Sequence, residues 1–123
     1  MGKTEENMEM NFKGETSEVG LYLAMSKRAE EEGHPDIALY LRQVAMDEAW
    51  HAAEFATLLR KISDTKTNLE KMAGGEGGAH KGKSEAARIA REEGNEEEAA
   101  LFERAAKDEA RHKAGLKGFL SKL

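Results

Sequence analysis

The stretch Asp47-Glu48-Ala49-Trp50-His51 decides how this chain folds. Glu48 and His51 are three residues apart, so they share one face of a helix. The same face continues at heptad spacing through apolar residues: Ile37, Leu41, Val44, Phe55, Leu58 and Ile62. A carboxylate and an imidazole within a buried apolar seam are costly unless a partner compensates them. A metal ion compensates both at once, so the motif predicts metal ligands on this helix.

The motif recurs as Asp108-Glu109-Ala110-Arg111-His112, about 61 residues later. It again interrupts an apolar seam, formed by Phe102, Ala105, Leu116, Phe119 and Leu123. Three other short segments match at the same offset without gaps: Asn7 with Asn68, Gly14-Glu15 with Gly75-Glu76, and Glu31-Glu32-Gly33 with Glu92-Glu93-Gly94. The chain is therefore predicted to contain two copies of a helical hairpin, residues 1–61 and 62–123, within a single domain 1–123.

Composition limits the class of protein. The 123 residues are 35% charged and 6% aromatic with one proline, which favours an all-α domain. A net charge of −5 gives no basic surface for nucleic acid. No apolar run of ~18 residues predicts a membrane span, and the polar N-terminus lacks a signal-peptide core, so a cytoplasmic location is expected. Cysteine is absent, which excludes disulfides and thiolate-bound metals.

Four helices are predicted, at about residues 4–32, 35–61, 68–94 and 95–121. Gly33 and Gly94 end the first and third of these helices, and Pro35 suits the first position of the second. Asn68 is the expected cap of the third helix. That helix contains five glycines between 74 and 82, so it is either the least stable helix or one that a neighbour approaches closely.

Each repeat supplies three candidate metal ligands. Its first helix carries one glutamate, and its second helix carries the Glu-x-x-His motif. The two sets are Glu15 with Glu48 and His51, and Glu76 with Glu109 and His112. Two single glutamates and two Glu-x-x-His motifs are the ligands with which a four-helix bundle holds two metal ions. Oxygen-rich ligation with one imidazole per ion suits iron or manganese better than structural zinc.

Other polar residues near the motifs have simpler interpretations. Asp47 and Asp108 precede the ligand glutamates and are predicted to orient an imidazole of a neighbouring helix, the alternative being solvent-facing charges. His80 is predicted to be exposed, and Lys83 to extend its charged end to solvent. Trp50 is interpreted as a packing residue.

These motifs together resemble the ferritin-like domain of rubrerythrins. The resemblance covers essentially the whole chain and depends on the complete, duplicated set of motifs. It implies a ferritin-like four-helix bundle with a non-haem di-iron centre. It also implies an enzyme that reduces hydrogen peroxide to water with electrons from a rubredoxin-type donor. Because the chain has no cysteine, it is similar to the short members that lack a rubredoxin domain.

Two further residues acquire roles from the resemblance. Rubrerythrins carry an extra carboxylate, usually three residues after the second-hairpin glutamate, that exchanges with a histidine as iron changes its redox state. This chain has Ala79 there, and Glu18 lies at the matching place in the first hairpin. Glu18 is therefore expected to be a metal ligand, with His112 as its exchange partner. Tyr22 matches the first-hairpin tyrosine, a hydrogen-bonding or electron-relay residue, whereas Ser84 lies near the place of the second-hairpin tyrosine.

The link between the repeats limits how the bundle is assembled. About six residues reach at most ~20 Å, whereas a helix of ~25 residues is ~38 Å long. The link therefore cannot cross the length of a bundle. Either the four helices run up and down in order, or the first hairpin of one chain pairs with the second hairpin of another. The resemblance favours the second arrangement, an exchanged homodimer with two di-metal sites.

Three functions compete at this point. The first is peroxide reduction at a di-iron centre, with dioxygen as another possible oxidant. The second is a ferroxidase or iron-storage protein without peroxidase turnover, although storage cages usually come from longer chains. The third is a bundle that uses zinc or ion pairs for stability alone. Manganese or zinc could also replace iron in the site.

Overall fold

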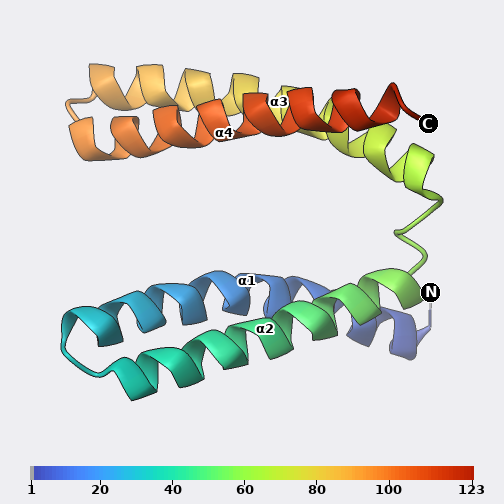
Figure 1. The fold of residues 1–123 in the computed structure, drawn as a ribbon, viewed down its shortest axis with the longest axis horizontal. Coiled ribbons are helices and arrows are strands. Elements are labelled where there is room, and N and C mark those ends of the chain that lie inside the picture. The colour runs from blue at the N-terminus through green and yellow to red at the C-terminus, as the bar shows by residue number, and fades with distance from the viewer. Residues whose placement is uncertain (1) are drawn as a thin grey trace. The chain divides into compact units, whose positions relative to one another are not determined.

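A computed structural model describes residues 2–123, and these residues form four α-helices and no β-strand (Figure 1). The helices are α1 (Lys3–Glu31), α2 (Pro35–Leu58), α3 (Thr65–Glu92) and α4 (Glu96–Leu120). The all-α class predicted from the sequence is confirmed. Within the described residues, no helix carries an apolar stretch long enough to span a lipid bilayer.

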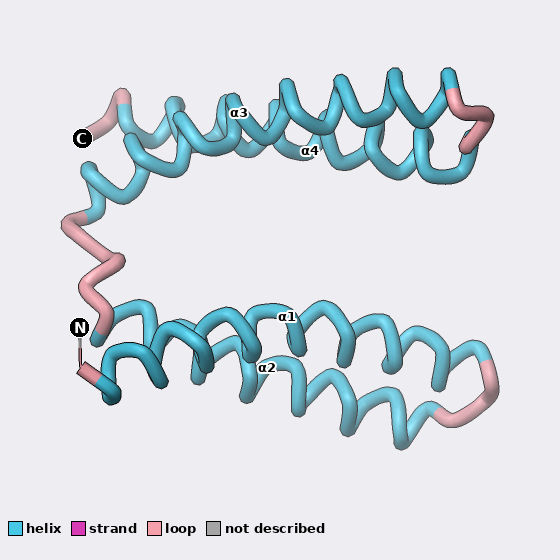
Figure 2. Tube along the Cα trace, turned by 180° about the vertical axis from the view of Figure 1, so that it is seen from behind, coloured by secondary structure: helices cyan, strands magenta, loops and turns pink. Residues whose placement is uncertain are grey.

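The helices form two antiparallel hairpins, α1 with α2 and α3 with α4, each closed by a short loop (Figure 2). One compact unit ends at Ile62 and the next begins at Ser63. Gly33 and Gly94 close the two hairpins with φ angles of 83° and 79°. Residues that carry a side chain rarely adopt this left-handed backbone conformation, which explains the glycine at both turns.

The start of α3 corrects one prediction. Asp64, not Asn68, caps this helix, because its carboxylate accepts a hydrogen bond from the Thr67 N–H at 3.0 Å. The hydrogen bonds from Thr67 also lower the pKa of Asp64. Asn68 lies inside the helix, where its side-chain amide bonds the Ser63 N–H and C=O. An aspartate four residues earlier satisfies the free N–H groups first, so the helix begins before Asn68.

Alanines form the contact between the two helices of each hairpin. In α2 the buried residues are Ala38, Ala45, Ala52 and Ala56, and in α3 and α4 they are Ala73, Ala87, Ala90, Ala99 and Ala106. In α1 the buried residues are Ser26 and Ala29. The Ser26 hydroxyl donates to the Ala38 carbonyl at 2.7 Å. Small side chains let the helix axes approach closely, and the spacing of Ala38, Ala45 and Ala52 repeats every heptad.

The predicted apolar seam lies on a different face from these alanines. Ile37 and Leu58, which share the seam with Glu48 and His51, are 49% and 68% exposed in the hairpin. Phe102 and Phe119 of the corresponding seam in α4 are also exposed. Leu41, Val44 and Phe55 in the middle of the seam are half-buried, so only part of the seam lies outside the contact between the two helices. Its exposed residues remain free to bury apolar area against another pair of helices.

Enlarging one interface alanine should separate the helices of the first hairpin. Ala45 is 1% exposed, so an Ala45→Leu side chain has no space and is expected to cost about 1–3 kcal/mol of stability. Thermal unfolding followed by circular dichroism measures this loss. The matched control is Ala53→Leu, an exposed position on the same helix, which should leave the melting temperature nearly unchanged. Equal effects of the two substitutions would contradict the alanine interface.

The glycine-rich segment of α3 is helical throughout. A Cβ atom at Gly77 would lie 3.0 Å from the Lys113 Nζ of α4, whereas one at Gly74, Gly75, Gly78 or Gly82 would meet nothing within 4 Å in the described chain. Within its own hairpin, α3 is thus closely approached at Gly77. Gly77 leaves space for a lysine that crosses from α4.

Candidate metal centre

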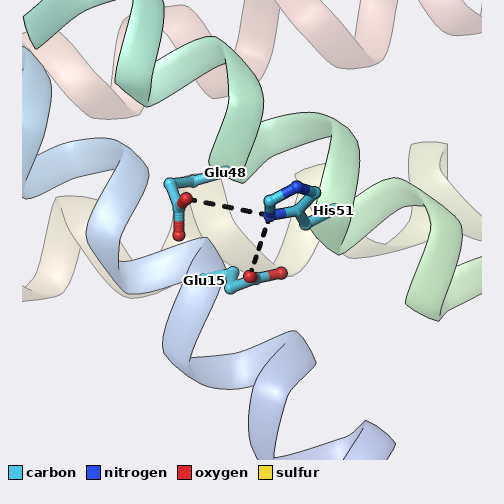
Figure 3. Close-up of side chains that lie close together, drawn as sticks. All are labelled: Glu15, Glu48 and His51. Atoms are coloured by element: carbon cyan, nitrogen blue, oxygen red, sulfur yellow. Dashed lines mark hydrogen bonds and ion pairs between the residues drawn. The ribbon is translucent and has the colours of Figure 1, made fainter.

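The first candidate site joins α1 to α2 (Figure 3). The Nδ1 atom of His51 lies 3.0 Å from Glu15 Oε1 and 3.7 Å from Glu48 Oε1. One ligand atom of each residue lies within 4.8 Å of those of the other two. Two carboxylates and an imidazole at these distances can share one metal ion.

The second candidate site repeats this geometry between α3 and α4. His112 Nδ1 lies 3.4 Å from Glu76 Oε2 and 3.9 Å from Glu109 Oε1. Their ligand atoms again fall within 4.8 Å of one another. The six ligands chosen from the sequence therefore lie in two groups of three, one in each hairpin.

The helices place the ligands at matching depths and burial. Glu15 and His51 are each 18 residues from Gly33, so a rise of ~1.5 Å per residue brings both to about 27 Å from the turn. The four glutamate side chains are only 17–19% exposed, while the two imidazoles are about half exposed. The carboxylates are thus partly desolvated before any cation binds, which strengthens their attraction for one.

Two carboxylate oxygens test whether the residues fit a metal. Glu15 Oε2 and Glu76 Oε2 are buried and have no hydrogen-bond partner in the described structure. His112 Nδ1 is 3.4 Å from Glu76 Oε2, a charge contact that lacks the geometry of a hydrogen bond. A buried carboxylate oxygen without a partner destabilises the fold. A cation bound at each group would compensate that oxygen, so the donor sets fit metal ions.

Two groups of the first site have raised pKa values in the metal-free protein. A side-chain hydrogen bond with Glu18, followed by burial and the charges of Glu18 and Glu15, raises the pKa of Glu48 above 4.5. A hydrogen bond to Glu15, supported by its charge and that of Glu48, raises the pKa of His51 above 6.5. The hydrogen bond to Glu15 therefore favours the protonated form of His51.

These shifts set the pH dependence of the metal-free protein. A raised pKa stabilises the fold below the unfolded value and loses that effect as pH rises through the folded value. The melting temperature is therefore expected to fall as pH rises above 6.5, with the loss from Glu48 beginning above 4.5. His51→Gln should remove the fall above pH 6.5, and His34→Gln, at an exposed turn, should preserve it. Calorimetry after chelation measures this, and a rise in melting temperature with pH would contradict it.

Glu18 and Tyr22 have different positions relative to this group. The carboxyl of Glu18 lies within hydrogen-bonding reach of Glu48, but Glu18 is exposed and outside the compact three-residue group. Tyr22 is half-buried and lies two helical turns after Glu15 on the same side of α1. Glu18 is thus placed beside the ligands, where a rotation of its side chain could bring it to a metal ion.

The remaining polar residues are placed as follows. Asp47 is exposed, and its charge makes a small contribution to the raised pKa of His51. Asp108 pairs with Arg111 at 3.1 Å within α4, so its orienting role stays a prediction. The prediction that His80 is exposed was wrong, because His80 Nδ1 lies 2.9 Å from the Ala106 carbonyl in a partly buried position. A histidine facing the alanine interface can donate to the opposite backbone.

Lys83 contacts Glu109, a neighbour that the sequence did not predict. Its Nζ lies 3.8 Å from Glu109 Oε2, so the ammonium faces a candidate ligand and not only solvent. The repeat contained a signal for this contact, because Lys83 is the counterpart of Tyr22 at the offset of about 61 residues. A residue matching one beside the first site should lie beside the second.

Comparison with known proteins gives consistent results. A family model described as Rubrerythrin matches residues 6–120. The chain is 45% identical over 119 residues to an uncharacterized protein of Methanocaldococcus jannaschii, covering 96% of this chain and 84% of that protein. It is 40% identical over 119 residues to reverse rubrerythrin-1 of Clostridium acetobutylicum, covering 95% of this chain and 66% of that protein. The chain thus spans about two thirds of the length of the second relative.

Proposed function

The chain belongs to the rubrerythrin family, and we propose that it is a non-haem di-iron oxidoreductase that reduces hydrogen peroxide to water. The resemblance predicted from the sequence is thereby confirmed, while peroxide as substrate is our proposal. An external donor of the rubredoxin type would supply the electrons. We further propose that the protein acts in the cytoplasm.

One observation carries the proposal of a metal centre. Each hairpin brings two carboxylates and an imidazole together, and one oxygen of its first-helix glutamate is buried without a hydrogen-bond partner. No hydrogen bond compensates that oxygen, and a divalent cation would be attracted to it. The proposed ligands are Glu15, Glu48 and His51 of the first hairpin, and Glu76, Glu109 and His112 of the second. Glu18 would join the first set as a further ligand.

Two ferrous ions, when bound, would supply the two electrons that reduce one peroxide molecule, and two protons complete the formation of two water molecules. The residues of the chain would bind the ions, exclude other ligands and compensate the positive charge of the ions. His51, whose Nδ1 lies 3.0 Å from Glu15 Oε1, would offer that nitrogen to a cation in its deprotonated form. Glu18 would move toward or away from the iron as the charge of the iron changes. His112 would be the ligand with which it exchanges. The phenol of Tyr22 could donate a hydrogen bond near the site.

The number of candidate ligands in each hairpin supports a site shared between two hairpins. Three protein ligands are fewer than a four- to six-coordinate iron or manganese ion requires, and bridging carboxylates can hold two ions about 3.5–4 Å apart. The exposed apolar seam accompanies Glu48 and His51 on the same face of α2. We therefore propose that α1 and α2 of one chain pair with α3 and α4 of a second chain in an exchanged homodimer with two di-metal sites. Size-exclusion chromatography that gives a metal-loaded monomer would exclude the exchange.

Stopped-flow oxidation of the ferrous protein tests the proposed reaction. The protein is loaded with iron without oxygen and mixed with either hydrogen peroxide or dioxygen, and the absorbance of ferric iron is followed. Faster oxidation by peroxide, together with reduction by a rubredoxin-type donor over several cycles, supports a peroxidase. The alternative is an iron-oxidising or storage protein. Growth of iron mineral beyond two ions per site would support it, and no redox response would leave a structural site.

A further inference from the structure

The two hairpins present the same three candidate ligands. Their first helices differ at the positions three and seven residues after the candidate ligand, on the side of the helix that carries it. Glu18 corresponds to Ala79, and Tyr22 corresponds to Lys83, at the offset of about 61 residues. These positions lie about one and two turns after the first-helix glutamate of each set, on the same side of the helix. The ligands are therefore duplicated, but the charges around them are not.

Lys83 places a positive charge on the second set alone. Its Nζ is 3.8 Å from Glu109 Oε2, and its side chain is only about one third exposed. Tyr22, its counterpart in the first hairpin, has a phenol in place of an ammonium group. The ammonium of Lys83 therefore competes with a metal ion for one oxygen of Glu109, and it also repels a cation bound nearby.

Glu18 has the opposite effect on the first set. Its carboxyl lies within hydrogen-bonding reach of Glu48, and no acid stands at the matching position, Ala79. Counted by residue type, the first set with its neighbour Glu18 contains three carboxyl groups and no ammonium group. The second set with Lys83 contains two carboxyl groups and one ammonium group. A divalent cation is attracted more strongly to the first.

We infer that Lys83 makes the set of Glu76, Glu109 and His112 the weaker of two metal positions, so that the first divalent cation binds in the other hairpin. The inference rests on the proposed metal centre. Lys83 contacts a ligand and not the substrate, so it is a positioning residue that sets the order of loading. A unit charge about 4 Å from its partner near a protein surface changes affinity by roughly tenfold or more.

Titration of the full-length protein with Mn²⁺ at low ionic strength tests this inference, with free Mn²⁺ measured by electron paramagnetic resonance. Wild type should bind in two steps of unequal affinity. Lys83→Gln should tighten the weaker step by about tenfold or more and tighten the other step less, because Lys83 lies beside Glu109 of the second set. Lys83→Arg, which keeps the charge, should preserve the difference. Lys81→Gln, at an exposed position on the same helix, should change neither step.

Nuclear magnetic resonance identifies which half binds first. Substoichiometric Zn²⁺, which is diamagnetic, should shift the imidazole signals of His51 before those of His112 in wild type. The two signals are assigned with His51→Gln and His112→Gln. In Lys83→Gln this order should weaken, whereas a variant that only loses helix stability would alter circular dichroism without changing the order.

The possible results test the role of Lys83 separately from the proposed metal centre. No binding of Mn²⁺ by wild type would overturn the metal centre, and the inference with it. Two equal steps that Lys83→Gln leaves unchanged would overturn the role of Lys83 alone. A first shift at His112, or unequal steps that Lys83→Gln leaves unchanged, would also overturn it. Unequal steps that Lys83→Gln brings closer together would support it.

Discussion

Replacing His51 with alanine should remove one of the two proposed metal ions and abolish the proposed peroxide reduction. His51 is the only imidazole of its group and lies 3.0 Å from Glu15 and 3.7 Å from Glu48. Loss of a group that merely orients a ligand weakens metal binding by about 10–100-fold, so loss of the ligand itself should exceed about 100-fold. Iron content after anaerobic loading and the rate of ferrous oxidation by peroxide measure the two effects.

His34 offers the matched control for this substitution. It is an exposed histidine at the turn before α2, outside both groups of ligands. His34→Ala should therefore keep two ions and full activity. His51→Ala protein that retained two ions and wild-type turnover would contradict the proposed site. Wild-type iron content with lost turnover would show that His51 serves the reaction and not metal retention.

The second large effect concerns the exposed seam of α2. Ile37 and Leu58 lie on the face of Glu48 and His51 and are 49% and 68% exposed in the hairpin. If this face is buried when hairpins pair, Ile37→Glu with Leu58→Glu should cost about 3–6 kcal/mol per chain. The double variant is expected to elute as a monomer, lose metal and melt at least ~10 °C lower. Light scattering and calorimetry measure these changes.

Leu39 provides a control on the same helix. It is 59% exposed, and its nine-residue separation from Glu48 places it on the opposite face of α2 at about 100° per residue. Leu39→Glu should therefore leave the oligomeric state and metal content unchanged. If the double seam variant remained a loaded dimer of wild-type stability, the seam would not be the surface that joins hairpins.

The sequence predicted the elements of this fold well because their signals are local. Glycine is required at Gly33 and Gly94 by the left-handed turn, and Pro35 suits the first position of a helix. The duplication located both groups of ligands without knowledge of distances. The predicted cap of α3, Asn68, was wrong. Asp64 and Asn68 are both residue types that cap helices well, and their positions in the chain decide which of them meets the free N–H groups.

The face used for pairing could not be predicted in the same way. Large apolar residues suggested that the seam of Ile37 and Leu58 forms the core, but Ala38, Ala45 and Ala52 form the contact with α1. Alanine gives a weak hydropathy signal, yet its small size permits the closest approach of helices. Bulky seam residues such as Ile37, Leu58 and Phe119 therefore stay exposed, on the same faces as the candidate ligands.

The sequence by itself determined the helices, the duplicated hairpin and the six candidate glutamate and histidine ligands, because spacing along a helix fixes which residues share a face. Only the tertiary structure decided which faces meet and which charges lie together. It placed alanines between the helices, left Glu15 Oε2 and Glu76 Oε2 buried without partners, and brought Lys83 to Glu109. Such contacts join residues far apart in the chain, and their distances depend on how closely two helices pack.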